Sequence, residues 1–272
     1  DWSIWWSILR LWPLFLVALG LDLLIGRRSV LGALVSALLV VLIFVGALWL
    51  TTNGLAAAGL TSQDIVQPLG DATQAEVTID PVMGVLRLSV LPESANLVEG
   101  EILLASGEQV REESSQQGSN VYYTLRAGEG SWEPFSGFFN EHRVWDLGLS
   151  PGATLRLLPG PTFGQQELDL TGLDLDELRT SGALGIANVI LPAEGRYEAH
   201  ISQALGIIEI RVPKGLGVRL NAGTAMVLRQ LPADFQKQDG NVYLSPGYAS
   251  AESRVDLNVN LALGLVTVRY LE

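Results

Sequence analysis

The stretch ALGIIEIRV at residues 204–212 decides the fold, because four other segments of the chain share its layout. In each copy a hydrophobic residue precedes a glycine, and a run of alternating hydrophobic and mostly polar residues follows it. Such alternation is typical of a β-strand with one buried face and one solvated face. The five copies are VMGVLRLSV (82–90), FGQQELDL (163–170), ALGIANVIL (183–191), ALGIIEIRV (204–212) and ALGLVTVRY (262–270).

The hydrophobic positions of each copy fall on the same side of the expected strand. In the fourth copy they are Ile208, Ile210 and Val212, the second, fourth and sixth residues after the glycine. Glu209 and Arg211 lie between them. Because side chains alternate across a strand, we expect the aliphatic residues to face a core and the charged residues to face water.

The glycines themselves indicate how the strands are assembled. Gly164, Gly185 and Gly206 are evenly spaced by 21 residues. A fixed period of this size is typical of stacked β rungs, as in a solenoid, rather than of a closed globule. Glycine at the start of each strand permits a bend or a bulge where the chain turns. The sequence therefore predicts a β-repeat domain over residues 75–272.

The N-terminal part of the chain has a different pattern. Two long apolar runs flank Arg27 and Arg28, and the second run, residues 30–50, contains no charged residue. A helix of this length would span about 31 Å at about 1.5 Å per residue, close to the bilayer core of roughly 30 Å. The sequence therefore predicts a transmembrane helical hairpin with an interfacial, tryptophan-rich N-terminus over residues 1–60, and a linker over 61–74.

Charged and aromatic residues suggest the orientation of this hairpin. Arg27 and Arg28 lie at its expected tip, whereas Trp12 and Trp49 lie at its two other ends. Arginines in short loops favour the cytoplasmic side, and tryptophans favour the membrane–water boundary. We therefore expect a two-pass protein of the bacterial cell membrane, with the β domain outside the cytoplasm.

Small residues in the second apolar run allow close helix packing. Gly32 and Ser36 lie one turn apart on the expected helix. Small residues let a neighbouring transmembrane helix approach closely. That neighbour is either the first helix of the same chain or another subunit.

Composition excludes several classes of function. The net charge of the chain is −12, and because residues 1–60 contribute +1, the remainder carries −13. A domain this acidic is unsuited to binding nucleic acid, because contacts to the phosphates need clustered lysines and arginines. The chain has no cysteine and only two histidines, which argues against thiolate chemistry and a histidine metal site. No catalytic motif is present, so we expect neither an enzyme nor a cofactor.

An acidic run, LDLTGLDLDEL at residues 168–178, allows two interpretations. Asp169, Asp174, Asp176 and Glu177 supply the oxygen ligands that calcium prefers. Leucines alternate with these acids, however, as they do in a strand with one wet face. We favour the solvated strand.

Aromatic residues gather in GEGSWEPFSGFFNEHRVW at residues 128–145, which glycines and a proline interrupt. This segment is either a docking surface for a partner or the membrane, or a local core under a long loop. We favour the core. The residues concerned are Trp132, Phe135, Phe138, Phe139 and Trp145.

Several stretches resemble bacterial LiaI/LiaF-like membrane proteins. The run LWPLFLVALGLDLLIGRRS (11–29) is similar to their membrane region. The segments AEVTIDPVMGVLRLSVLPESANLVEGEI (75–102), LDLTGLDLDELRTSGALGIANVILP (168–192) and GYASAESRVDLNVNLALGLVTVRYL (247–271) resemble their C-terminal toast-rack domain. The resemblance implies a toast-rack β-repeat fold and an association with envelope-stress regulation. It transfers no functional residue, because the matching glycines and aliphatic residues are architectural.

The leading hypothesis is thus a non-enzymatic, membrane-anchored envelope protein whose β domain binds a protein partner or senses envelope stress. A second hypothesis is a structural or accessory subunit of a larger membrane complex or homo-oligomer. A third is an adhesin or glycan binder that uses the aromatic segment. The expected partners are the lipid bilayer and a membrane or envelope protein.

Overall fold

The computed structural model describes residues 60–92, 94–104, 108–128 and 143–271. The chain divides into two compact units, residues 1–58 and 59–272, and the described residues belong to the second. They contain strands and no helix, and hence no helix that could cross a membrane. The predicted hairpin over residues 1–60 lies almost entirely outside the described residues.

Fifteen strands make up the described part of the chain. They are β1 (Thr61–Pro68), β2 (Gln74–Asp80), β3 (Met83–Val90), β4 (Asn96–Leu104), β5 (Val110–Gln117), β6 (Asn120–Ala127), β7 (Val144–Leu149), β8 (Thr154–Pro159), β9 (Phe163–Asp169), β10 (Asp174–Ile190), β11 (Arg196–Val212), β12 (Gly217–Gln230), β13 (Gln236–Lys237), β14 (Val242–Leu244) and β15 (Arg254–Tyr270).

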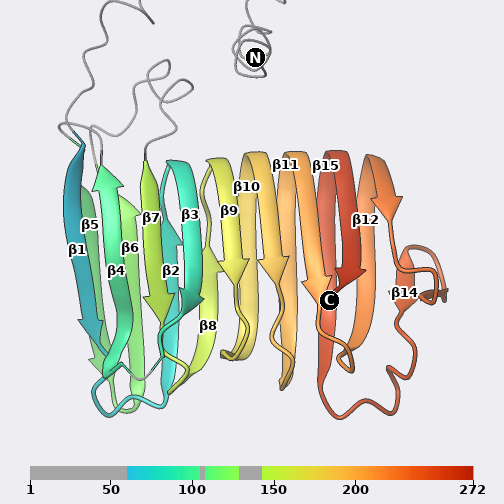
Figure 1. Cartoon of the computed structure of the whole chain (residues 1–272), viewed down its shortest axis with the longest axis horizontal. Helices are drawn as coiled ribbons and strands as arrows, with labels where there is room; N and C mark the ends of the chain where they lie inside the picture. The colour runs from blue at the N-terminus through green and yellow to red at the C-terminus, as the bar shows by residue number, and fades with distance from the viewer. Residues whose placement is uncertain (1–59, 93, 105–107, 129–142, 272) are drawn as a thin grey trace, which may run out of the picture. The chain divides into compact units, whose positions relative to one another are not determined.

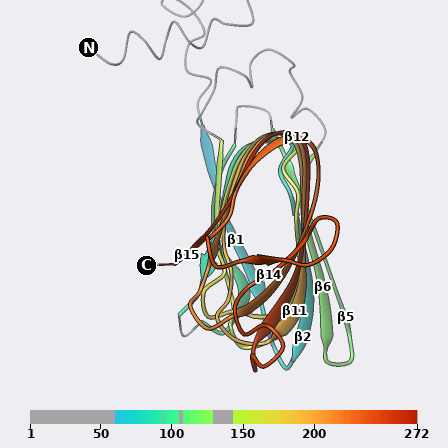
Figure 2. The ribbon, with the colours of Figure 1, turned by 90° about the vertical axis from the view of Figure 1, so that its right-hand side faces the viewer.

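The strands stack side by side into a two-layered β repeat (Figures 1 and 2). Each long strand, β10, β11, β15 and β12, runs along one layer, bends, and returns along the other. The pairs β2/β3 and β8/β9 do the same with two shorter strands each, and β6 and β7 lie beside β2 and β3 in the two layers. Most neighbours are parallel, so equivalent residues of successive rungs lie next to one another. The mainly β, stacked fold predicted from the sequence is confirmed.

The five repeat glycines form one continuous ladder at the bend. The strand register pairs Gly84 with Gly164, Gly164 with Gly185, Gly185 with Gly206, and Gly206 with Gly264. All five have positive φ, for example 139° at Gly206. A Cβ on Gly206 would lie 1.9 Å from the carbonyl oxygen of Gly185. The expected bend is thus confirmed, and it needs glycine both for its backbone conformation and for close approach.

The bend also changes which residues face inward. In β11, Ile201 and Gln203 are buried before the bend, whereas Ile208 and Ile210 are buried after it. The inward positions therefore change from odd to even numbers, and the paired register passes over Ala204. One additional residue at the bend lets both halves of a single strand direct their apolar side chains into the same core.

The first strand differs from the sequence expectation. We expected a linker over residues 61–74, but Thr61–Pro68 forms β1 and pairs with β4 in the antiparallel direction. Ile65 is its buried anchor, at 1% exposure. Its other residues are mostly polar because β1 is an edge strand with one face in water, and this concealed it in the sequence.

The order of rungs differs from the order of the chain. The last strand, β15, lies between β11 and β12. Likewise, the β2/β3 rung lies between β6/β7 and β8/β9. These insertions bring segments that are distant in sequence onto one surface, including those of the groove described next.

Candidate interaction surface

We call the layer formed by the strand halves that precede the glycines the first layer, and the other the second layer. Charged side chains form rows on the outside of the first layer, because equivalent positions of neighbouring strands lie about 4.8 Å apart. Glu177 of β10 is in register with Glu198 of β11, which is in register with Asp256 of β15. Arginines flank this row of acids. Arg156 Nε lies 2.7 Å from Glu177 Oε2, and Arg219 Nη1 lies 3.8 Å from Asp256 Oδ1.

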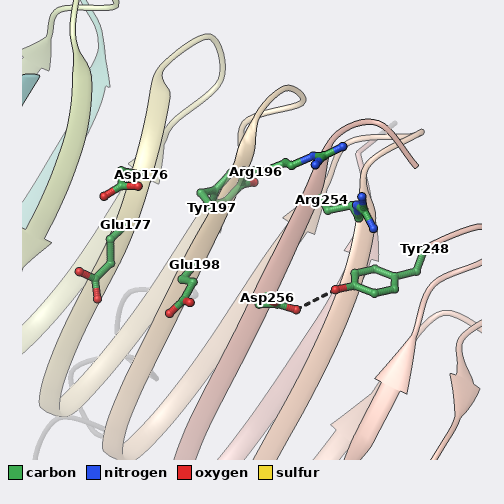
Figure 3. Close-up of a pocket in the computed structure, with 8 residues that line it drawn as sticks. All are labelled: Asp176, Glu177, Arg196, Tyr197, Glu198, Tyr248, Arg254 and Asp256. Carbon is green, nitrogen blue, oxygen red and sulfur yellow. Dashed lines mark hydrogen bonds between the residues drawn. The ribbon is translucent and has the colours of Figure 1, made fainter. Parts of the chain in front are cut away.

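A cavity of about 540 Å³ lies along this row and is open to solvent (Figure 3). Strands β10, β11 and β15 supply seven of its eight lining residues, and the segment after β14 supplies the eighth. We call it the charged groove. Its lining consists of Asp176, Glu177, Arg196, Tyr197, Glu198, Tyr248, Arg254 and Asp256.

Hydrogen bonds hold several of these side chains in place. The Tyr248 hydroxyl donates to Asp256 Oδ1 at 2.9 Å (Figure 3). Burial, and then this carboxylate, raise the pKa of Tyr248. Arg196 Nε donates to the carbonyl oxygen of Glu252 at 3.1 Å. The buried Tyr197 hydroxyl donates to the carbonyl oxygen of Pro192 at 3.0 Å, and burial raises its pKa.

The chemistry of the charged groove suits recognition. Four carboxylates and two guanidinium groups line it, together with two tyrosines. Within the described ranges, no three acidic or histidine side chains are grouped to hold a metal ion. A row of acids beside a pair of arginines fits a polar partner of complementary charge.

The second layer carries a comparable row of charges. Arg87 Nε donates to Glu167 Oε2 at 2.8 Å, and this bond raises the pKa of Arg87. Glu209 accepts hydrogen bonds from Arg269 on the neighbouring strand and from Arg211, at 3.0 Å, on its own strand. The bond from Arg269 is the largest cause that lowers the pKa of Glu209.

Replacement of Arg269 by alanine should cost little stability, less than about 1 kcal/mol, because exposed ion pairs are screened by water. The Arg269 side chain is 55% exposed. In the folded chain the pKa of Glu209 lies below its ordinary value of 4.5. The ion pair therefore contributes to the free energy of unfolding above pH 4.5, and this contribution disappears as the pH falls through the folded pKa. Urea unfolding of the native chain and of the Arg269→Ala variant at pH 7 and pH 3 measures the loss of stability. A larger loss at pH 3 than at pH 7 would contradict this prediction.

The acidic run at residues 168–178 contains a strand with one buried face and one solvent-exposed face. Leu173, Leu175 and Leu178 are buried, and the acids between them face outward. Asp174 Oδ2 accepts a hydrogen bond from the Thr154 hydroxyl at 2.7 Å, and Glu177 pairs with Arg156. The alternation of buried leucines and outward acids confirms the solvated-strand interpretation.

The structure places one residue of the aromatic segment. Trp145 is 1% exposed and lies in the core, paired in register with Leu86 and Ile102. Its ring is therefore not available for a partner surface, because β7 directs it inward. The remaining candidate residues lie outside the described residues: Trp12, Arg27, Arg28, Gly32, Ser36, Trp49, Trp132, Phe135, Phe138 and Phe139.

Sequence reasoning missed the charged groove, although a signal was present. Glu177, Glu198 and Asp256 each precede their repeat glycine by eight residues. Because the glycines are in register, so are the acids. The repeat therefore extends upstream of each glycine, into the half of the strand that lies on the first layer.

The repeat stack defines the class of protein only at the level of its fold. No protein family model matches the chain, and no curated protein sequence matches it. A solved structure from Clostridium sporogenes, described as a candidate cell adhesion protein, is similar with a TM-score of 0.68 and 16% sequence identity. The match covers 78% of this chain and 100% of that one. At this identity the likeness shows a shared β-rich fold.

A second solved structure, a candidate adhesin from Bacteroides fragilis, matches 78% of this chain and 97% of its own. Its sequence identity is 9% and its TM-score is 0.27. A score this low supports no conclusion about shared architecture.

Proposed function

We propose that the chain is a non-enzymatic envelope protein, anchored in the bacterial cell membrane by residues 1–60, whose extracytoplasmic β stack binds a protein partner. In this proposal it acts in envelope-stress sensing or regulation, as the resemblance to LiaI/LiaF-like proteins implies. The observation that carries the proposal is the charged groove, an open surface with a row of acids beside a pair of arginines.

The form of the groove favours a protein over a small ligand. Small-molecule sites are mostly enclosed and apolar, with few polar groups. The charged groove instead is open and lined chiefly by charged residues from three strands. Such surfaces give specificity and fast association with partners of complementary charge. The description of the Clostridium sporogenes protein as a candidate cell adhesion protein is in keeping with a binding role.

A charge-reversal experiment tests this function. The double variant Arg196→Glu, Arg254→Glu changes two cations of the groove whose side chains face outward (Figure 3). In cells that lack the native protein, we expect this variant to fail to restore the response of an envelope-stress reporter to cell-wall-active antibiotics. Reversal of Arg269 on the second layer is the matched control, and it should restore the response.

Protein level and membrane fractionation must be equal for both variants, since a poorly folded variant would also fail. A full response with the groove variant would contradict the proposed role of the groove. An unchanged reporter in cells that lack the protein altogether would contradict the regulatory function itself.

A further inference from the structure

Exposed apolar side chains are concentrated along the bend of the stack. Of the nine large hydrophobic residues exposed among the described residues, six flank the glycine ladder, with exposures from 40% to 75%. We call this set the apolar edge. It consists of Leu184, Ile186, Leu205, Ile207, Leu228 and Leu263.

The strand register joins these residues into two rows. Leu184, Leu205 and Leu263 are successive partners on β10, β11 and β15. Ile186 and Ile207 begin the second row, which passes through Leu265 to Leu228 on β12. At about 4.8 Å per strand, the second row extends over about 14 Å. In Figure 1 this edge is the upper rim, where the long strands bend. The edge is therefore a continuous apolar strip.

Charge is absent from the bends of β8/β9, β10, β11, β12 and β15, whereas Arg143 lies against Gly84 at the bend of β3. Residues 157–166, 180–187, 201–208, 220–228 and 257–266 contain no Asp, Glu, Lys or Arg. The charges of these rungs lie further along the strands or at the opposite turns, as at Glu194 and Lys214. A protein interface carries a polar rim around its apolar centre, whereas a surface that enters lipid excludes charge. The pattern favours lipid as the occupant.

The N-terminal end of the stack also begins on the side of the bends, with four strands between β1 and β10. Thr61, where β1 begins, pairs with Leu104, and the adjacent Leu103 pairs with Val144. Val144 in turn pairs with Val85, the residue after Gly84 of the glycine ladder. β1 thus begins at the bend, and Leu60 before it is 43% exposed.

Residues 51–59 lie between Leu60 and the uncharged apolar run at 30–50. Nine residues reach at most about 32 Å when fully extended. The chain that precedes β1 therefore joins the stack on the side of the bends, and not at the opposite turns.

We propose that the apolar edge binds the surface of the lipid bilayer, with its leucine and isoleucine side chains inserted among the lipids. This inference rests on the membrane anchor of the proposed function. It gives the stack a defined orientation. Glu177, Glu198 and Asp256 lie eight residues from the bend, which holds the charged groove about 26 Å from the lipid at about 3.3 Å per residue.

The absence of cysteine from the chain makes a labelling test direct. The full chain is reconstituted in vesicles of phosphatidylcholine and phosphatidylglycerol that contain a nitroxide-labelled lipid. A fluorescent label is attached to a single cysteine, either Leu205→Cys on the apolar edge or Thr171→Cys at an exposed turn away from the bend. We expect nitroxide lipid to quench the label at 205 severalfold more than the label at 171.

A charge variant provides the matched control. Adding Ile207→Asp and Leu263→Asp to the chain labelled at 205 should remove the quenching while leaving the unfolding transition unchanged, because both side chains are exposed at 40% or more. Equal quenching at 205 and 171 would overturn the inference. So would a label at 205 that is shielded from aqueous iodide but not quenched by lipid, since a second copy or another protein would then cover the edge.

A third label separates this inference from the anchor. Val40→Cys lies within the uncharged run, and nitroxide lipid should quench its label if residues 30–50 cross the bilayer. Absence of quenching at 40 refutes the anchor of the proposed function. Quenching at 40 without quenching at 205 refutes only the apolar edge, and quenching at 205 alone supports the edge independently of the anchor.

Discussion

Replacement of Gly206 by alanine is expected to destabilise the β stack by more than about 3 kcal/mol, the range of changes that force a folded backbone to move. The added Cβ would lie 1.9 Å from the carbonyl oxygen of Gly185 and 2.8 Å from Gln203 Nε2. The φ of 139° adds strain of its own. Thermal unfolding of the full chain in detergent, followed by circular dichroism, measures the loss.

Gly215 is a matched control for the backbone strain alone. It has a positive φ of 95°, but a Cβ there would meet nothing within 4 Å. Gly215→Ala should therefore cost only the conformational term, about 1–3 kcal/mol. The difference between the two variants isolates the close approach of neighbouring rungs. Equal losses would show that backbone conformation alone explains the glycines.

The last rung shows where the requirement for glycine ends. Val227 of β12 pairs with Gly264 of β15 and occupies the ladder position. The pairings of the described residues place β14 beside β12 only at Asn221, Leu220 and Arg219, before the bend. The bend of β12 therefore has a neighbour on one side only and can relax away from it, so a β-branched side chain is tolerated.

Much of this architecture could be predicted from local sequence pattern. The glycine spacing and the alternation after each glycine depend on neighbouring residues, and the core positions such as Ile208 and Ile210 followed from them. The order of the rungs did not, because β15 pairs with β11 across a separation of 58 residues, as between Gly206 and Gly264. Pairing over such distances is decided by the whole stack and leaves no local signal.

The candidate surfaces were predictable to different degrees. The acids of the charged groove repeat at a fixed distance from the glycines, so an alignment of the repeats would have placed them in one row. The apolar edge was only partly predictable, because the alternation after the glycine places Ile207 on the outward face with Glu209 and Arg211 but gives no position for Leu205. Leu205 continues the buried positions Ile201 and Gln203, and the bend turns it outward.

A buried ion pair had no sequence signal at all. Arg143 Nε lies 3.2 Å from Glu108 Oε2, and their side chains are 8% and 5% exposed. Arg143 Nη1 also lies 3.8 Å from the sulfur of Met83. The two charges come from segments 35 residues apart, and their burial depends on the rung that β3 and β7 form.

Arg143→Ala should destabilise the chain by about 3–5 kcal/mol at pH 7, because it removes the cation that lies 3.2 Å from the buried Glu108 carboxylate. Unfolding in urea measures this loss. Arg87→Ala is the control, since Arg87 Nε lies 2.8 Å from Glu167 Oε2 but the two side chains are 46% and 39% exposed. That variant should lose less than about 1 kcal/mol.

A double variant distinguishes the stranded charge from lost packing. Combining Arg143→Met with Glu108→Gln removes both charges and keeps most of the side-chain volume, and it should recover a large part of the stability lost in Arg143→Ala, because apolar or neutral substitutes for a buried pair are often tolerated. If the double variant were no more stable than Arg143→Ala, packing against Met83 and Gly84 would be the main role of Arg143. If Arg143→Ala cost no more than Arg87→Ala, the burial of this pair would have no energetic consequence. The comparison of Arg143→Ala with Arg87→Ala tests burial in particular. Arg143 and Arg87 each pair with a glutamate at a similar distance, and the two pairs differ chiefly in their exposure to water.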